Sequence, residues 1–238
     1  YKRQAYREIL FSITVAQSTS LSFRRRIMPI GLYRELETPQ PRDFIEAVNS
    51  LNDKLGKKNV QILHSIAKPN QVLIFAGYKS LAECESQSDE YVSAGLPQIV
   101  RDHGVSLVDQ GFSVIEASND PEHTMLGTHD YVVLTGGLVK IGKMAEVIAS
   151  GSRVIEKIGP ELLSHGIGSM LIRAVSGTNL NMVANRVALP TSEAAEEFIT
   201  RSPGGRPEIA EDMKEWLGNM KSITRGVFKV KRKWGPFD

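Results

Sequence analysis

The sequence lacks the features of several protein classes. Its 238 residues include a single cysteine, Cys84, which excludes an internal disulfide and any cysteine-rich metal site. No apolar run reaches the roughly 18 residues that a membrane-spanning helix needs, and no low-complexity stretch indicates general disorder. Hydrophobic residues make up 41% and charged residues 24% of the chain. This composition is typical of a globular protein that can bury a sizeable core.

The net charge is also small, +2 for the whole chain, but it is unevenly distributed. Residues 1–26 and residues 221–238 each carry a net charge of +5, and subtracting both from +2 leaves −8 for the body. Basic ends can dock on an acidic protein surface, anionic lipid, nucleic acid or the body of the same molecule. Neither end interleaves aromatic with basic side chains, which makes nucleic acid an unfavoured partner. We expect a homo-oligomer or a protein-complex partner, held through these basic termini.

The opening segment gives an indication of location. Residues 1–26 are basic, rich in serine and threonine and almost free of acid, as transit peptides are. Residues 8–16 fit a strand and a helix about equally well, so their structure stays open. The single cysteine permits a reducing compartment. We therefore expect a protein of the cytoplasm or the mitochondrial matrix that is not secreted.

From residue 30 onward, strand and helix patterns alternate. Strands are predicted where β-branched residues recur with a period of two, at residues 30–36, 60–66, 71–78 and 112–117. Helices are predicted where apolar residues recur at helical spacing, at residues 44–55 and 80–103, the second with a break near residues 95–97. Ser80 is the expected N-cap of the second helix, and glycines follow both helices.

The same order of elements recurs after a polar, turn-rich linker at residues 119–128. The second set of predicted strands covers residues 131–139, 167–174, 182–189 and 224–230. The second set of predicted helices covers residues 144–162 and 191–220, the latter with a break at residues 203–205. The expected helix caps Ser80 and Thr191 lie 111 residues apart, as do the preceding hairpin strands. We therefore predict a tandem repeat of element order.

This repeat divides the chain into five parts. The predicted parts are an N-terminal extension (1–26), a first unit (27–118), the linker (119–128), a second unit (129–231) and a C-terminal tail (232–238). A β-α-β-β-α-β unit forms a four-stranded antiparallel sheet with both helices on one face. The other face would be a large exposed apolar surface. Two units can cover each other's open faces, which predicts an α+β protein whose sheets pack together as a barrel, with the space between them filled or left as a pocket.

The stretch from His165 to Leu189, followed by the helix sequence from Thr191 to Phe198, resembles the dimeric α/β-barrel (ferredoxin-like) superfamily. Within that superfamily the second half is similar to NIPSNAP-type and antibiotic-biosynthesis-monooxygenase-like domains, in which a hairpin with a Gly/Asn turn also leads into a helix of this kind. The resemblance covers residues 129–231 and, more loosely, residues 27–118. The superfamily includes cofactor-free oxygenases, haem enzymes, lyases, isomerases and non-catalytic proteins, so the resemblance implies a fold rather than one reaction.

Basic strand residues are the main candidates for a pocket. Strand alternation places His64 on one face with Val60 and Ile62, and Arg173 occupies the matching position in the second unit. If that face looks into the barrel, His64 and Arg173 could meet a bound anion or act on a carbonyl substrate. The alternative is that both are partly exposed residues with local partners. The remaining candidates, from strands where one of two adjacent residues must face inward, are Asn185, Arg186, Tyr33 and Arg34.

Two further patterns have structural explanations. Residues 137–143 satisfy the GxxxxGK pattern of a phosphate-binding loop, but Met144 stands where the magnesium-holding Ser or Thr is required. We expect a strand–helix junction there. His103 and His165 each precede a glycine in a last helical turn, where a cation complements the helix dipole, so we expect capping roles. No histidine pair has the spacing of a metal site, and we expect none.

Two functions stay open after these considerations. The first is a small-molecule-binding α/β-barrel protein, such as a cofactor-independent oxygenase or lyase, with its pocket between the two sheets. The sequence requires no cofactor for this activity. The alternative is a non-catalytic structural or interaction subunit of a homo- or hetero-oligomeric assembly, held by the basic termini.

Overall fold

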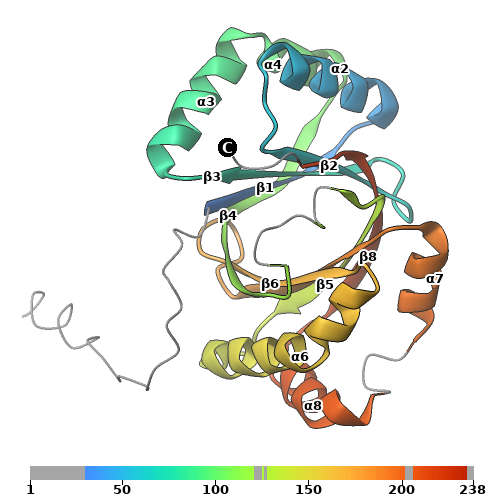
Figure 1. Ribbon diagram of the computed structural model, residues 1–238. Helices are drawn as coiled ribbons and strands as arrows, with labels where there is room; N and C mark the ends of the chain where they lie inside the picture. Colours follow the sequence, from blue (N-terminus) through green and yellow to red (C-terminus); the bar gives the residue numbers. More distant parts are fainter. Residues whose placement is uncertain (1–29, 121–124, 126–127, 202–205, 235–238) are drawn as a thin grey trace, which may run out of the picture.

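A computed structural model describes residues 30–120, 125, 128–201 and 206–234 (Figure 1). The basic N-terminal extension at residues 1–26, with its open assignment at residues 8–16, lies outside the described residues. So do residues 235–238 of the predicted C-terminal tail.

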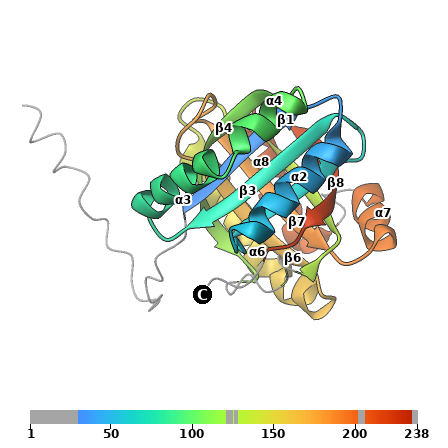
Figure 2. The same ribbon diagram turned by 90° about the horizontal axis from the view of Figure 1, so that it is seen from above.

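Eight strands form one closed antiparallel barrel (Figure 2). In chain order they are β1 Ile30–Glu37, β2 Val60–Ser65, β3 Gln71–Tyr78, β4 Ser106–Ser118, β5 Tyr131–Leu138, β6 Gly168–Ala174, β7 Met182–Leu189 and β8 Thr224–Arg232. The order around the barrel is β1-β3-β2-β8-β5-β7-β6-β4, and β4 pairs back onto β1. The predicted strands are therefore confirmed. The exception is the start of β4, which lies well before residue 112 because its polar first residues pair with the end of β1.

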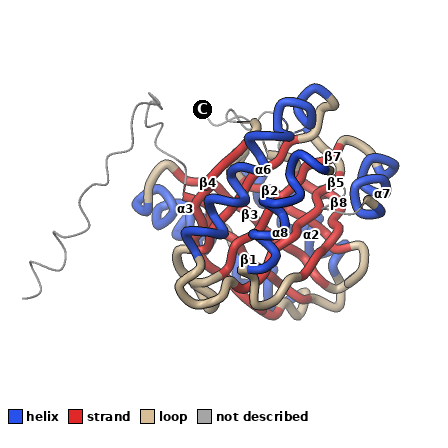
Figure 3. The backbone as a smooth tube through the Cα atoms, turned by 90° about the horizontal axis from the view of Figure 1, so that it is seen from below, coloured by secondary structure: helices blue, strands red, loops and turns tan. Residues whose placement is uncertain are grey.

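The helices lie in two layers outside the barrel. They are α2 Pro41–Lys54, α3 Leu81–Ser93, α4 Leu96–Asp102, α6 Met144–Ser164, α7 Ser192–Thr200 and α8 Ala210–Gly218, with a short 3₁₀ turn, η1, at Pro207–Ile209. Helices α2–α4 cover β1–β4, and α6–α8 cover β5–β8 (Figures 1 and 3). Within the described part of the chain, no helix is both long and apolar enough to cross a bilayer.

The helix ends follow the sequence signals. The Ser80 hydroxyl accepts a hydrogen bond from the backbone N–H of Glu83, and Thr191 accepts one from Ala194, as N-caps do. The helix predicted from residue 80 breaks between α3 and α4 as expected. His103 and His165 close α4 and α6, each before a glycine with positive φ, so their capping roles are confirmed.

The two halves of the barrel share strand order and register. The order β4-β1-β3-β2 in the first half recurs as β8-β5-β7-β6 in the second. In the first half Ile30 lies opposite Tyr78, and in the second Tyr131 lies opposite Leu189. The halves join where β2 pairs with β8 and where β4 pairs with β6.

Alternation sorts the strand residues into an outer set that faces the helices and an inner set that faces the barrel axis. The inner set includes one apolar cluster from both halves: Leu63, Leu73, Val132, Phe228 and Val230. A second inner cluster contains Met170 and Ala188, with Ile115 and Ile172 against it. Apolar side chains therefore fill much of the space between the two half-sheets, where the sequence predicted a pocket.

The GxxxxGK pattern marks the junction between β5 and α6. Gly137 lies in β5, and a Cβ atom there would come within 1.9 Å of the Ser222 carbonyl oxygen. Gly142 has a φ of +77°, a left-handed conformation that favours glycine. Both glycines therefore have a structural explanation in the packing of this junction.

Candidate functional site

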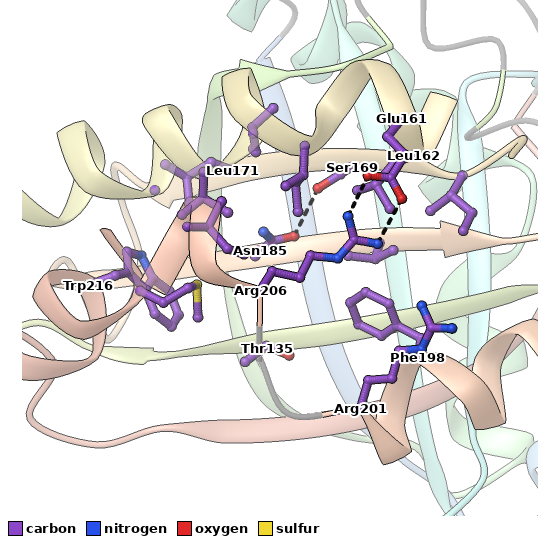
Figure 4. A pocket seen from close by; sticks show the side chains of 18 of the residues that line it. Thr135, Glu161, Leu162, Ser169, Leu171, Asn185, Phe198, Arg201, Arg206 and Trp216 are labelled. Atoms are coloured by element: carbon purple, nitrogen blue, oxygen red, sulfur yellow. Dashed lines mark hydrogen bonds and ion pairs between the residues drawn. The ribbon is translucent and has the colours of Figure 1, made fainter. Parts of the chain in front are cut away.

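A cavity of about 710 Å³ lies between the outer face of the β5–β8 half-sheet and helices α6, α7 and α8 (Figure 4). Its walls are mainly apolar, formed by Val154, Ile155, Ile158, Leu162, Ile167, Leu171, Val187, Phe198, Ile209 and Met213. A volume of this size with a few polar groups is typical of small-molecule sites. The cavity is thus on the helix-covered side of the second half-sheet and not between the two half-sheets.

The floor of the cavity carries a row of polar side chains from neighbouring strands. Thr135 lies opposite Asn185 on one side and opposite Arg225 on the other. Arg225 Nε donates a hydrogen bond to Thr135 Oγ1 at 3.0 Å. Ser169 Oγ donates one to Asn185 Oδ1 at 3.3 Å. Because the bond from Ser169 engages the oxygen of Asn185, the amide nitrogen of Asn185 stays available to a ligand.

Two uncharged hydrogen-bond donors on the cavity wall have no acceptor within the described residues. One is Asn185 Nδ2, whose side chain bonds only through its oxygen. The other is Trp216 Nε1, which belongs to a side chain only 4% exposed. A buried donor without an acceptor costs on the order of 1–3 kcal/mol. Both donors line the same cavity, so a ligand that presents acceptor oxygens would satisfy them.

Charged residues surround the outer part of the cavity. Arg206 makes a two-pronged ion pair with Glu161 of α6, at 2.6 and 3.0 Å (Figure 4). This pair lowers the pKa of the Glu161 carboxyl group, because the guanidinium favours its charged form. Arg201 pairs with Glu197 within α7. Each of these arginines has an acidic partner, so the apolar walls and the two open donors dominate the site's chemistry.

His165 is the one histidine among the cavity-lining residues. Its Nδ1 lies 2.9 Å from the Glu161 carbonyl oxygen, which can only accept a hydrogen bond. Nδ1 therefore carries the proton in this contact, and Nε2 is left as the lone-pair nitrogen. In that tautomer His165 can accept a proton from a bound molecule.

The sequence-derived candidates do not come together at this cavity. Asn185 lines it, but the neighbouring Arg186 points the opposite way, into the barrel, and is 1% exposed. Its guanidinium bonds Gln61 and lies over the Phe75 ring, with 5.3 Å to the ring centroid. Burial lowers the pKa of Arg186 to about 10. Arg186 therefore belongs to the barrel interior rather than to the cavity.

The other candidates lie apart from one another. His64 and Arg173 face outward, toward the helix side, since their partners Val72 and Val183 belong to the helix-facing clusters. His64 Nε2 lies 2.7 Å from the Pro69 carbonyl oxygen, and Arg173 makes a 2.5 Å ion pair with Glu116 on β4. His64 and Arg173 occupy matching positions in the two halves, as predicted from the sequence. Both have local partners, which was the alternative to a role in a pocket.

Tyr33 and Arg34 divide between the two faces of β1. The Tyr33 hydroxyl donates a hydrogen bond to Asp109 at 3.2 Å, and burial, with that carboxylate, raises the pKa of Tyr33 to about 12. Arg34 lies opposite Ile74 on the helix-facing side. Neither residue lines the cavity.

Several cavity residues were not singled out from the sequence as site residues. They are Thr135, Ser169, Trp216 and Arg225, with His165 assigned only a capping role. A signal was present in the second unit, where polar residues interrupt otherwise apolar helix-facing strand positions. The alternation Val183, Asn185, Val187 shows this pattern. Trp216 looks like an ordinary core residue in sequence, because its open donor is visible only in three dimensions.

The comparisons with known proteins show a shared fold at low sequence identity. No protein-family model matches the sequence, and the search of curated proteins also finds no match. A solved structure described as a "putative monooxygenase" from Fusobacterium nucleatum subsp. nucleatum has a TM-score of 0.67 and 11% identity, covering 90% of this chain and 98% of that chain. Another with the same description, from Lactobacillus acidophilus, has a TM-score of 0.59 and 13% identity, covering 88% and 98%. An anthrone oxidase-like protein has a TM-score of 0.59 and 12% identity, covering 87% and 94%. The chain therefore has the α/β fold of monooxygenase-like proteins.

Proposed function

We propose that this protein binds a small, mainly apolar molecule with acceptor oxygens in the cavity beneath α6–α8, and oxidises it as a cofactor-independent oxygenase. The observation that carries the proposal is the pairing of an apolar 710 Å³ cavity with two open donors, Asn185 Nδ2 and Trp216 Nε1. A carbonyl or phenolate oxygen would satisfy these donors. The fold shared with monooxygenase-like proteins supports the same class of reaction.

The cavity residues supply what such a reaction needs from a protein. An enol or phenol becomes a reductant for dioxygen when it loses a proton, and His165, the histidine that lines the cavity, is the group we propose as the base. Asn185 and Trp216 would then stabilise the negative charge on the substrate oxygen by hydrogen bonds. Lyase chemistry on a carbonyl compound would use the same base and donors, and it differs in consuming no dioxygen.

Binding and oxygen uptake with anthrone test the proposal. We expect anthrone to bind in isothermal titration calorimetry, a readout that does not depend on Trp216, and to be consumed together with dioxygen. Asn185→Leu keeps the volume and removes the donor, so we expect the affinity to fall by about tenfold. Trp216→Phe removes the second donor with a similar effect. Trp234→Phe, at a tryptophan outside the cavity lining, is the matched control and should leave binding unchanged.

The outcomes separate the open functions. Binding without oxygen uptake would retain the small-molecule site and reject the oxygenase. Unchanged affinity in both Asn185→Leu and Trp216→Phe would reject the cavity as the site. The competing function, an assembly subunit held by the basic termini, predicts a complex in native mass spectrometry that is lost when those termini are neutralised.

We further propose that the two halves derive from one duplicated ferredoxin-like unit, of the type found in NIPSNAP-like and antibiotic-biosynthesis-monooxygenase-like proteins. The repeated strand order and the repeated register support this origin. Under this proposal one unit kept a ligand cavity and the other lost it. Expression of residues 128–234 alone tests whether the second unit still assembles as a self-paired barrel.

A further inference from the structure

Exposed apolar side chains gather at one end of the barrel. Six connections meet at this end, between β1 and α2, β2 and β3, α4 and β4, β5 and α6, β6 and β7, and α8 and β8. Seven of the large, exposed hydrophobic residues of the described chain lie in or beside them: Ile66, Leu107, Val108, Ile141, Val175, Leu180 and Ile223. We call this set the apolar end. Soluble surfaces carry single exposed apolar residues routinely, but a gathering of this kind marks an interaction site.

Backbone hydrogen bonds hold the second-half loops of the apolar end together. The Val139 N–H donates to the Asn181 carbonyl at 2.8 Å, and the Lys140 N–H donates to the Asn219 carbonyl at 2.9 Å. The Lys221 N–H donates to the Leu138 carbonyl at 2.7 Å. These bonds fix the loops that carry Ile141, Leu180 and Ile223 next to one another. Ile141 is 94% exposed, so its side chain projects almost wholly into solvent from a fixed loop.

The loops of the apolar end are basic, and acidic residues lie at their margins. The six connections span residues 38–40, 66–70, 103–105, 139–143, 175–181 and 219–223, and they contain four lysines but no aspartate or glutamate. The lysines are Lys68, Lys140, Lys143 and Lys221. The acidic residues nearest in sequence are Glu37 and Asp102, at the ends of β1 and α4, Asp109, which follows Val108 in β4, and Glu146, which pairs with Lys143. The excess of positive charge therefore lies in the second-half loops, at Lys140 and Lys221. Lysines beside projecting apolar tips are the pattern by which proteins bind an anionic membrane surface.

We propose that the apolar end docks onto an anionic lipid surface, with Ile141, Leu180 and Ile223 entering the interface between headgroups and acyl chains. A second copy of this chain fits less well, because two lysine-bearing ends would repel each other. An acidic protein would match the charge, but a set of separate projecting tips needs a separate pocket for each on a protein. A lipid interface accepts such tips wherever they lie, because it is fluid.

Flotation of the full chain with lipid vesicles tests this proposal. We expect the protein to float with vesicles of phosphatidylcholine and phosphatidylglycerol, and not with vesicles of phosphatidylcholine alone. Replacing Ile141→Ser and Leu180→Ser together should weaken binding by at least about tenfold, because apolar area no longer enters the bilayer. Lys221→Gln should weaken it by about fivefold, with a matching loss of salt sensitivity.

Matched controls separate the apolar end from the rest of the molecule. The double variant Leu81→Ser/Val92→Ser removes two exposed apolar residues on α3. Lys54→Gln removes a lysine near the opposite end of the barrel. Both controls should bind as the unchanged protein does. Bromine-labelled lipid should quench the fluorescence of the tryptophan introduced by Ile141→Trp. It should not quench the fluorescence of the tryptophan introduced by Val92→Trp.

Three results would overturn the proposal. The first is equal binding by the Ile141/Leu180 variant and the unchanged protein, which would place the lipid contact elsewhere, for example in the basic N-terminal segment. The second is no flotation with either kind of vesicle. The third is a change of oligomeric mass in the Ile141/Leu180 variant, which would make this end a contact between copies of the chain.

Discussion

The two halves of the barrel have the same strand order, and the cavity of about 710 Å³ lies under the helices of the second half. In the first half, α2 places Phe44 and Val48 in one apolar cluster with Ile62 and Val72 of the sheet. In the second half, α6 presents Val147 and Gly151 toward its sheet, and the space left over becomes the cavity. The difference shows that a packed layer and a binding site can be built on one strand framework by changing the size of a few helix residues.

The floors of the two layers differ in polarity at matching positions. In the first half Ile74 lies opposite Arg34. At the matching positions of the second half, Asn185 lies opposite Thr135. In the first half Val60 lies opposite Ala76. At the matching positions of the second half, Ser169 lies opposite Val187. Among these positions the first floor is apolar apart from Arg34, whereas Thr135, Asn185 and Ser169 give the second floor uncharged polar groups that line the cavity.

The helices of the second half also rely more on charge to stay in place. Asp212 of α8 is bound by Arg153 and Lys157 of α6, each at 2.7 Å, and Arg153 also pairs with Glu215 at 2.5 Å. These ion pairs join α6 and α8 at the surface, above the layer in which the cavity lies.

The largest expected difference between the layers concerns their aromatic residues. Phe44→Ala should lower the free energy of unfolding by about 3–5 kcal/mol, because Phe44 is fully enclosed in the first-half core. Phe198→Ala should cost only about 1 kcal/mol, because Phe198 already faces the cavity. Urea denaturation of both variants measures the difference. Equal losses would show that the second layer is as tightly packed as the first.

Exchanging the floor residues gives the next largest effect. Ile74→Asn should destabilise the protein by about 1–2 kcal/mol, because the amide would replace the contacts of a half-buried apolar side chain with the first-half cluster. Asn185→Ile should leave stability unchanged within about 0.5 kcal/mol and should lower the affinity for an acceptor-bearing ligand such as anthrone by about tenfold, as we expect for Asn185→Leu. Thermal denaturation and fluorescence titration of the pair measure the two effects. A stable Ile74→Asn protein that binds anthrone in the first half would remove the distinction between the floors.

Much of this fold follows from local sequence signals. The valine and isoleucine alternation located the strands, and Ser80 and Thr191 marked helix starts that the structure confirms. The barrel followed from the recurrence of four strands in each half and the need to cover two open sheet faces. These features are predictable because each depends on neighbours along the chain or on a repeated order.

The site was harder to locate because alternation shows which residues share a face without showing where that face points. His64 shares its face with Val60 and Ile62, as predicted, but that face meets the helices instead of the barrel axis. The cavity itself depends on small residues in α6, such as Gly151, and on Trp216 from a distant helix. No periodicity in the sequence connects those two elements.

A smaller effect tests the ionic contribution to the second layer. Lys157 and Arg153 lower the pKa of the Asp212 carboxyl group by hydrogen bonding to its charged form. The stabilisation is therefore fully present above the ordinary aspartate pKa of about 4 and is lost as the pH falls through the lowered value. Asp212→Asn should cost about 1 kcal/mol at pH 7, since both cations are about half exposed.

Urea denaturation of the Asp212→Asn and unchanged proteins as a function of pH measures this contribution. The difference in the free energy of unfolding between the two proteins should fall to zero toward pH 2. Glu90→Gln, which removes the carboxylate that pairs with Lys57 in the first half, is the matched control with a smaller expected loss. A gap that stays constant over this pH range would show that Asp212 acts by packing rather than by charge.

The smallest expected change in stability comes from Gly151, where the helix of the second half passes closest to the cavity wall. A Cβ atom at this position would lie 3.0 and 3.1 Å from the two methyl carbons of Leu171 and 3.2 Å from Trp216 Nε1. Gly151→Ala gains about 0.5–1 kcal/mol of helix stability, which this crowding should cancel. The new methyl group nevertheless covers the open donor of Trp216, so anthrone affinity should fall severalfold while the melting temperature stays constant. Gly218→Ala, at the end of α8 with no atom within 4 Å of its Cβ position, should leave affinity unchanged. If Gly151→Ala bound anthrone as tightly as the unchanged protein, Trp216 Nε1 would not be a ligand contact, and the second layer would differ from the first in volume alone.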